Sequence, residues 1–176
     1  MVVEALRNQH FAVKVSVQGM IKTEAIILKT SDFNEVDRLL TVYSQKLGKI
    51  SISAKGVKKL ESKLRYSIEP ISYSHLIFVE GKNFLILKDA VLIDQFLKIK
   101  KDLEKIKIAR ELADLIDEAM VGEEKDEDVW KLILLTLKSL NKGEISLKSV
   151  ISDFQKKLIK LLGYNPEEMK DLKDIY

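Results

Sequence analysis

The sequence has no cysteine at all, and it has only two histidines and two prolines among its 176 residues. Without cysteine the chain has no disulfide, no thiolate nucleophile and no zinc site built on sulfur. The two histidines, His10 and His75, are too few for a histidine metal site and lack the HExxH spacing. We therefore expect no metal and no other cofactor.

Long apolar runs are also missing. No stretch of about 18 apolar residues occurs, and the N-terminus lacks the apolar block of a signal peptide. Because a chain without cysteine also suits a reducing compartment, these absences favour a cytoplasmic location.

Catalytic motifs are absent as well. The sequence contains no GxxxxGK[ST] loop, no GxGxxG fingerprint and no GxSxG elbow. Asp32, Glu35 and Asp37 cluster near a turn, but solvation of the turn or pairing with Arg38 explains them without any chemistry. His75 is interpreted as a structural residue. We predict that the protein is not an enzyme.

The composition is that of a globular protein, with 46% apolar and 32% charged residues. This apolar content is enough to bury the core of one large domain or two small ones. The formal charge is only +3, so a basic surface must arise from an uneven distribution. Residues 20–95 carry 12 Lys and Arg against 9 acidic residues, whereas residues 96–176 carry 16 against 17. The basic excess therefore belongs to the first half.

Alternation of apolar and polar residues in the first half indicates five short strands. We expect them at about residues 23–29, 38–43, 50–54, 71–80 and 84–93, with a hairpin turn at residues 81–83. Five such strands, with a basic and partly helical connection after the third, suit a small Greek-key barrel of the OB type. Periodicity alone fits an SH3-like barrel nearly as well.

From about Lys98 the apolar period changes from 2 to 3.6, which predicts helices. The first ends near Gly122 and the second near Gly143. The apolar content of the second helix predicts that it lies at the centre of a bundle. The third helix ends at Gly163. The apolar residues of the first helix are Leu103, Ile106, Ala109, Leu112, Ala113, Ile116 and Met120. Those of the second helix are Trp130, Leu132, Ile133, Leu134, Leu135, Leu137 and Leu140. Those of the third helix are Leu147, Val150, Ile151, Phe154, Leu158, Leu161 and Leu162.

The fold class expected is α+β, with a five-stranded OB-fold barrel at residues 20–96 and an all-α helical bundle domain at residues 97–176. Asn165 and Pro166 are good start signals for a short last helix. Residues 1–19 form an N-terminal extension, which is either a leader or an edge strand.

The stretch 48–65 carries the strongest functional signal. Ile50, Ile52 and Ala54 alternate with serines, so the apolar set points inward. Lys49 and Lys55 share the parity of the serines, and we expect both on one solvated face, roughly 20 Å apart. A turn with four further basic residues and a single acid follows Gly56. This excess indicates an anionic polymer as partner, although a charge run is also typical of an ordinary solvated face.

Aromatic residues of the first half show no alternation typical of an RNA-recognition strand, and most are expected in the core. They are Phe33, Tyr43, Tyr66, Tyr73, Phe78 and Phe84. Tyr66 comes directly after the basic turn, so it is the best candidate for stacking on a base.

Several short segments, taken in order and spacing, resemble the RecO family of bacterial recombination mediators. They are residues 24–30 (EAIILKT), 37–44 (DRLLTVYS), 47–50 (LGKI), 54–59 (AKGVKK), 62–64 (SKL) and 161–166 (LLGYNP). Glu69-Pro70 stands where the family usually has Gln-Pro. The resemblance covers Lys22 to Pro166.

The resemblance implies an N-terminal OB-fold followed by a helical domain. It also implies binding of single- and double-stranded DNA, annealing of complementary strands, and loading of RecA together with RecR and single-stranded DNA-binding protein (SSB). Base pairing supplies the sequence specificity, and no nucleotide is hydrolysed. The positions that the resemblance assigns to phosphate contacts are Arg38, Lys49, Lys55, Lys58, Lys59, Lys63 and Arg65.

One departure from the family pattern stands out. Many members place a four-cysteine zinc module just after the LGYxP segment, whereas this chain has no cysteine and stops ten residues past Pro166. It is either a short, zinc-free version or a truncation. In family members the SSB tail docks on the helical domain, at residues that cannot be matched here. An alternative function is an OB-fold interaction adaptor without direct DNA binding, whose basic turn meets an acidic partner.

Overall fold

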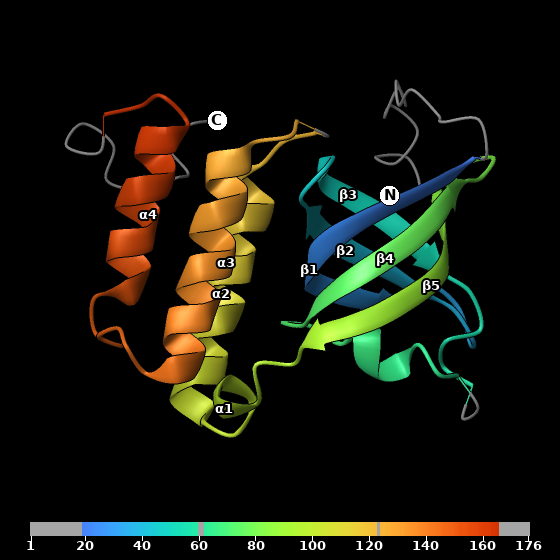
Figure 1. Ribbon diagram of the computed structural model, residues 1–176, viewed down its shortest axis with the longest axis horizontal. Helices are drawn as coiled ribbons and strands as arrows, with labels where there is room; N and C mark the ends of the chain where they lie inside the picture. Colours follow the sequence, from blue (N-terminus) through green and yellow to red (C-terminus); the bar gives the residue numbers. More distant parts are fainter. Residues whose placement is uncertain (1–18, 60–61, 123, 166–176) are drawn as a thin grey trace.

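The structure is a computed structural model that describes residues 19–59, 62–122 and 124–165. Within these ranges the chain forms five strands and then four α-helices, with one short 3-10 helix between the third and fourth strands (Figure 1). The elements are β1 (Met20–Asp32), β2 (Arg38–Ser44), β3 (Gly48–Ala54), η1 (Arg65–Ile68), β4 (Tyr73–Glu80), β5 (Leu85–Asp94), α1 (Leu97–Lys100), α2 (Leu103–Ala119), α3 (Glu127–Lys142) and α4 (Val150–Leu161).

The five strands close into a barrel in the order β1-β2-β3-β5-β4. β3 and β5 are parallel and pair through Ile52 with Leu85 and Ser53 with Ile86. The remaining neighbours, including β1 and β4, are antiparallel. This is the Greek-key order of an OB-fold, and the expected fold is confirmed.

The barrel interior is filled by one apolar cluster, which includes the inward set of β3 predicted from its alternation. Its buried members are Ala25, Ile27, Leu40, Val42, Ile50, Ile52, Ala54, Val57, Ile68, Leu76, Phe78, Leu85, Leu87 and Ala90. Successive side chains of a strand point to opposite faces, so the side chains that point out of the barrel can contact the helices or solvent.

β1 is longer than predicted and is buried on both faces. Ala25 and Ile27 point into the barrel, whereas Ile26 and Leu28 belong to a second cluster shared with the helices. The pairing with β2 shifts register between Ile27 and Lys29. Burial on two faces explains why this strand is a continuous apolar run instead of an alternating one.

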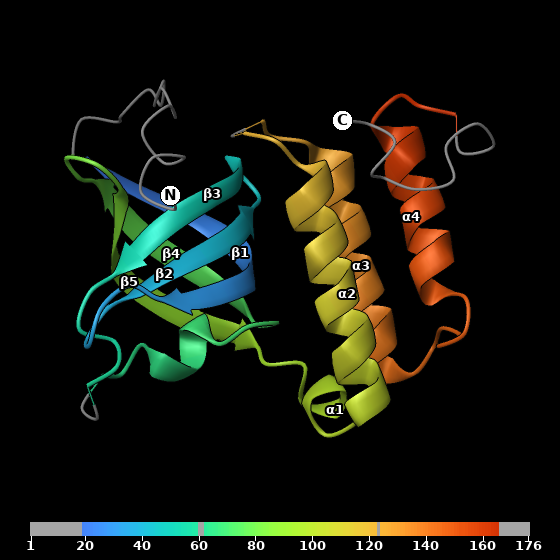
Figure 2. The same cartoon turned by 180° about the vertical axis from the view of Figure 1, so that it is seen from behind.

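The helices pack against the outer face of the barrel. Figures 1 and 2 show α2 and α3 between the barrel and α4. Their cluster takes Ile26, Leu28, Tyr43, Ile71 and Tyr73 from the barrel side. Because barrel and helices bury apolar surface together, this contact fixes how they sit relative to each other.

The first predicted helix is in fact two, α1 and α2, separated at Lys101 and Asp102. The Asp102 carboxylate accepts hydrogen bonds from the backbone N–H groups of Glu104 and Lys105 at 3.0 and 3.2 Å, so it caps α2. Leu103 is the first residue of α2 and is exposed, which contradicts its expected place on the apolar face.

The ends of the later helices follow the predicted signals more closely. Gly143 ends α3 with a positive φ of 81°, as a C-cap glycine does. Leu135 was expected inside the bundle but is exposed, because it lies at the edge of a pocket between α3 and α4. The predictions for residues 1–18 and for a last helix after Asn165 lie outside the described residues. No helix within those residues is long and apolar enough to cross a membrane.

Candidate nucleic-acid interface

The segment that follows β3 leaves the barrel on the side away from α4 (Figures 1 and 2). We call residues 55–65 the basic loop. Four of its basic side chains are exposed, and no salt bridge joins them to a carboxylate among the described residues. These four are Lys55, Lys59, Lys63 and Arg65. Their charges are available to an anionic ligand.

Lys58 and Arg38 are held differently, because both contact Asp32. The Lys58 ammonium lies 3.0 Å from Asp32 Oδ2 and donates to the Asn34 carbonyl oxygen at 3.2 Å. Arg38 Nε lies 3.5 Å from Asp32 Oδ1. The Lys58 hydrogen bond is the largest cause that lowers the pKa of Asp32. The negative charge of Asp32 therefore offsets part of the positive charge of Lys58 and Arg38, two residues predicted to contact phosphate.

The connection between β1 and β2 positions the start of the basic loop. Asp37 Oδ1 accepts a hydrogen bond from Gly56 N at 2.7 Å, and Lys58 N donates to the Val36 carbonyl oxygen at 3.1 Å. The Gly56 hydrogen bond lowers the pKa of Asp37. Gly56 has φ of +66°, which glycine adopts with little strain. The carboxylates at Asp32 and Asp37 are thus structural partners of the basic loop.

Lys49 does not lie on a solvated face, which corrects the expectation that it accompanies Lys55. Its ammonium donates to the Asp117 carbonyl oxygen at 2.6 Å and lies 3.2 Å from Asp117 Oδ1. Only 21% of its side chain is exposed. The outward face of β3 is covered here by α2, so the outward side chain meets a helix instead of water.

Lys29 on β1 joins the same contact with α2. Its ammonium lies 2.9 Å from Asp114 Oδ1 and 2.9 Å from Asp117 Oδ2. Despite a desolvation effect in the opposite direction, the two lysines lower the pKa of Asp117. We call Lys29, Lys49, Asp114 and Asp117 the interdomain ion cluster.

Two neutral contacts fix the same end of the barrel. Gly48 has φ of +69°, and a Cβ there would lie 2.2 Å from the Glu124 carbonyl oxygen. The Tyr43 hydroxyl donates to the Asp126 carbonyl oxygen at 3.4 Å, and burial raises the pKa of Tyr43. The α2–α3 connection therefore packs against the turn between β2 and β3, at the end of β3 opposite to the basic loop.

The aromatic residues also differ from expectation. Phe33, predicted in the core, is 50% exposed, and its ring centroid lies 5.7 Å from that of Phe84 in an edge-to-face arrangement. Tyr66 is 63% exposed, as a stacking candidate must be. Phe33 stands directly after β1, among the polar residues of a turn, and this position in the sequence is the signal for its exposure.

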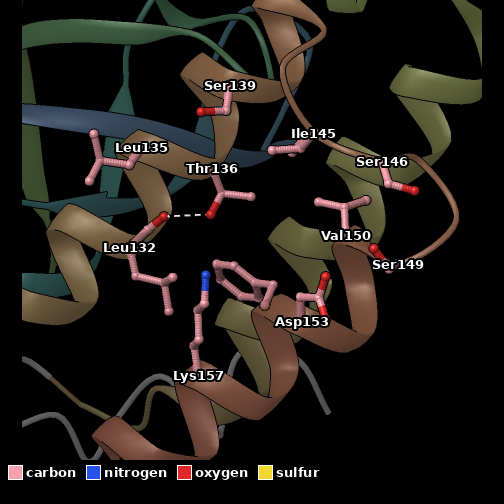
Figure 3. Close-up of a pocket in the computed structure, with 11 residues that line it drawn as sticks. Leu132, Leu135, Thr136, Ser139, Ile145, Ser146, Ser149, Val150, Asp153 and Lys157 are labelled. Carbon is pink, nitrogen blue, oxygen red and sulfur yellow. Dashed lines mark hydrogen bonds between the residues drawn. The ribbon is translucent and has the colours of Figure 1, made fainter.

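A pocket of about 310 Å³ lies between α3 and α4 (Figure 3). Leu132, Leu135, Val150 and Phe154 supply most of its apolar lining, and the Lys157 amine points toward it. Asp153 also lines the pocket, so its apolar walls carry one positive and one negative group. The sequence analysis assigned no residue to it. Among the described residues no group of three or more His, Asp or Glu gathers as a metal site.

The structure thus combines an OB-type barrel that carries an exposed cationic loop with a helical bundle packed against it. Comparison with known proteins agrees, since residues 19–96 match the family described as "Recombination protein O N terminal". The barrel therefore belongs to the RecO family, and similarity to RecO proteins extends over 83–84% of the chain.

Three relatives carry the name DNA repair protein RecO. The Thermoanaerobacter sp. (strain X514) protein is 30% identical over 148 residues, which is 84% of this chain and 60% of the relative. The Clostridium perfringens protein is 34% identical over 146 residues, covering 83% and 59%. The Roseiflexus sp. (strain RS-1) protein is 33% identical over 146 residues, covering 83% and 51%. The chain thus spans between half and 60% of the length of these relatives.

Proposed function

We propose that this protein is a DNA-binding recombination mediator. It binds single- and double-stranded DNA through the basic loop, anneals complementary strands, and helps RecR to load RecA on SSB-coated DNA. RecR and RecA enter the proposal through the family relationship. The observation that carries the DNA-binding part is the group of four exposed cations, Lys55, Lys59, Lys63 and Arg65, without a salt-bridge partner among the described residues.

Binding would act on the phosphate backbone. Lysine ammonium groups on long, flexible stems meet phosphates of any sequence and release counterions when they do so. Contacts of this kind position a strand but carry no sequence information. The base edges stay free, so complementary pairing supplies the specificity of annealing.

Annealing in this scheme needs no nucleotide hydrolysis. Stacking contributes about 1.4 kcal/mol for each base-pair step formed, which makes pairing downhill once two strands lie together. The basic loop would serve to reduce the repulsion between two polyanions during their encounter.

The test is fluorescence anisotropy with a labelled single-stranded oligonucleotide over a series of salt concentrations. With about five phosphate contacts, log K should fall with log salt at a slope of about −3 to −4. The variant with Lys55, Lys58, Lys59 and Lys63 changed to Ala should lose most of the affinity and most of the slope. Unchanged binding by that variant would refute the assignment of the site.

A second candidate function is an interaction adaptor, and the α3–α4 pocket is the observation that favours it. Its apolar walls and the Lys157 amine suit the acidic tail of SSB, which docks on the helical domain of family members. A labelled acidic peptide should bind the chain, and Lys157→Ala should weaken that binding without affecting DNA. An adaptor without DNA binding would capture the peptide but show no salt-dependent affinity for the oligonucleotide.

A further inference from the structure

Two connections of the barrel meet through aromatic side chains. One joins β1 to β2 at residues 33–37, and the other joins β4 to β5 at residues 81–84. The Phe33 and Phe84 rings lie with their centroids 5.7 Å apart at an interplanar angle of 74°. Phe33 keeps half its surface in contact with solvent, and Val36 in the same connection is also exposed. An apolar patch is thus presented at the tips of two neighbouring loops.

The loop that carries Phe33 is tightly built. Phe33 N donates to the Asp37 carbonyl oxygen at 3.1 Å, and Asn34 Oδ1 accepts from Val36 N and Asp37 N at 2.9 and 2.8 Å. Asn34 Nδ2 in turn donates to Asp37 Oδ2 at 2.8 Å. Such an Asx turn sets the backbone direction and so presents the ring in a defined position.

The partner loop is equally constrained. Gly81 N donates to the Phe84 carbonyl oxygen at 2.9 Å, and a Cβ on Gly81 would lie 2.6 Å from that same oxygen. Phe84 supports the Phe33 ring from the side, so the exposed face of Phe33 need not collapse onto the barrel. A ring that is already ordered costs little entropy when it binds.

Charged groups of both signs lie beside this pair of rings. Asp32, Glu35 and Asp37 are on the Phe33 side, and Lys58 pairs with Asp32 while donating to the carbonyl oxygen of Asn34, the residue after Phe33. Gly56, in the basic loop, is bound to Asp37 in the Phe33 loop. The other loop contributes Lys82, whose side chain is exposed. Aromatic and cationic groups are therefore parts of one surface.

We propose that Phe33 is a stacking platform for an unpaired nucleobase, next to the cations that hold the backbone of the same strand. This inference rests on the proposed DNA-binding function and extends it to a preference for single strands. A π-face accepts any base, so stacking adds affinity without sequence readout. In a duplex the bases already stack on one another, and Phe33 gains no comparable contact. The exposed ammonium groups of Lys82 and of Lys55 and Lys59 in the adjoining basic loop favour nucleic acid over an apolar protein partner as the occupant of this patch.

The experiment compares three variants of the full chain on a dT oligonucleotide and on a duplex of equal length. Phe33→Ala removes the ring, Phe33→Leu keeps an apolar contact with Phe84 but has no π-face, and Phe33→Trp keeps a π-face. We expect the Ala and Leu variants to weaken single-strand binding about 5- to 150-fold, with Trp close to wild type. Duplex affinity should stay within about twofold of wild type. The salt slope should be unchanged, because no phosphate contact is lost.

A fluorescence signal gives an independent readout. The chain has one tryptophan, Trp130, which is buried, so the wild-type emission should not respond to an oligonucleotide. Phe33→Trp adds an exposed emitter, and dT oligonucleotide should quench it. Absence of quenching at saturating oligonucleotide would overturn the stacking contact.

Further outcomes separate the possible failures. If Phe33→Ala binds single strands as tightly as wild type, the inference is wrong while the basic loop stands. If Phe33→Ala weakens the binding of single strands and of duplex equally and also lowers the urea midpoint, the ring only holds the two loops together and does not stack on a base. Tyr66→Ala is the matched control, and a loss confined to that variant would transfer the role to Tyr66. If wild type binds no oligonucleotide at all, the proposed function fails with it.

Discussion

Two sets of lysines on the same barrel have opposite surroundings. Lys29 and Lys49 face α2, where Asp114 and Asp117 lie between 2.9 and 3.2 Å from their ammonium groups. Three lysines of the basic loop, Lys55, Lys59 and Lys63, are exposed and form no salt bridge among the described residues, whereas Lys58 pairs with Asp32. The residue type is the same in both places. What differs is whether a neighbouring element supplies carboxylates.

The contrast assigns separate roles to the two sets. A pair of charges at a partly exposed site contributes little net free energy, typically up to about 1 kcal/mol. The apolar cluster shared by barrel and helices contributes most of the stability of their contact, and the interdomain ion cluster adds a smaller contribution at the same contact. Val57 holds the basic loop in the barrel core, whereas Lys55, Lys59, Lys63 and Arg65 are exposed, so their charges remain available for a ligand.

The largest expected effect concerns the turn between β2 and β3. Gly48→Ala places a Cβ against the Glu124 carbonyl oxygen at a positive φ, so both the strain and the clash must be relieved by backbone movement. We expect a loss of about 3–4 kcal/mol in the free energy of unfolding, measured with urea.

Gly122→Ala is the matched control for this substitution. Gly122 also has a positive φ, of +85°, but nothing lies within 4 Å of a Cβ there. It should lose only the conformational strain, about 1–2 kcal/mol. Equal losses in the two variants would mean that the Gly48 contact does not hold the barrel against the helices.

A smaller effect is expected from Asp117→Asn, which removes the shared partner of Lys29 and Lys49. The free energy of unfolding should fall by about 1 kcal/mol at pH 7, after allowing for solvent screening of a partly exposed group. The pKa of Asp117 is lowered in the folded protein, so its contribution is present above pH of about 4 and is lost as pH falls further.

Urea midpoints at pH 7 and pH 3 measure this pH dependence. The wild type should lose more stability over that interval than Asp117→Asn, because the other lowered carboxylates, Asp32 and Asp37, are present in both proteins. Parallel losses would show that Asp117 does not stabilise the folded state through its charge.

The smallest effect concerns DNA. Asp32→Asn releases Lys58 and Arg38 from their carboxylate partner. Single-strand affinity at about 0.1 M salt should rise up to about fivefold, with a salt slope steeper by about 0.7, as for one added phosphate contact. Glu35→Gln makes the same change in net charge without freeing a paired cation, and anisotropy should show a smaller rise. An equal rise in the affinity of both variants would show that the effect comes from net charge alone.

The barrel and the helix ends follow from local patterns that the sequence displays directly. Ile50, Ile52 and Ala54 alternate and point inward, and Gly143 has the positive φ of a C-cap. Lys49 was placed wrongly because strand parity says which face a side chain leaves. It does not say that a helix 68 residues further along the chain covers that face.

Long-range pairing also explains the position of Ile71. It was predicted to begin a strand, yet it has φ of 56°, and β4 starts at Tyr73. Ile71 N donates to the Ile27 carbonyl oxygen at 2.8 Å, while Ile27 N donates to the Ser72 carbonyl oxygen at 2.9 Å. The backbone turns here to meet β1 beside its change of register. The alternation of apolar residues within residues 71–80 does not indicate this pairing with β1.

A side-by-side titration of two variants tests the division of roles most directly. One changes Lys55, Lys59, Lys63 and Arg65 to Ala, and the other changes Lys29 and Lys49 to Ala. At about 0.1 M salt the first should lose two to three orders of magnitude in single-strand affinity and keep its urea midpoint. The second should keep its affinity within about threefold and unfold at lower urea. If the second variant loses DNA binding as strongly as the first, the paired lysines contact DNA and the division between the two sets is wrong.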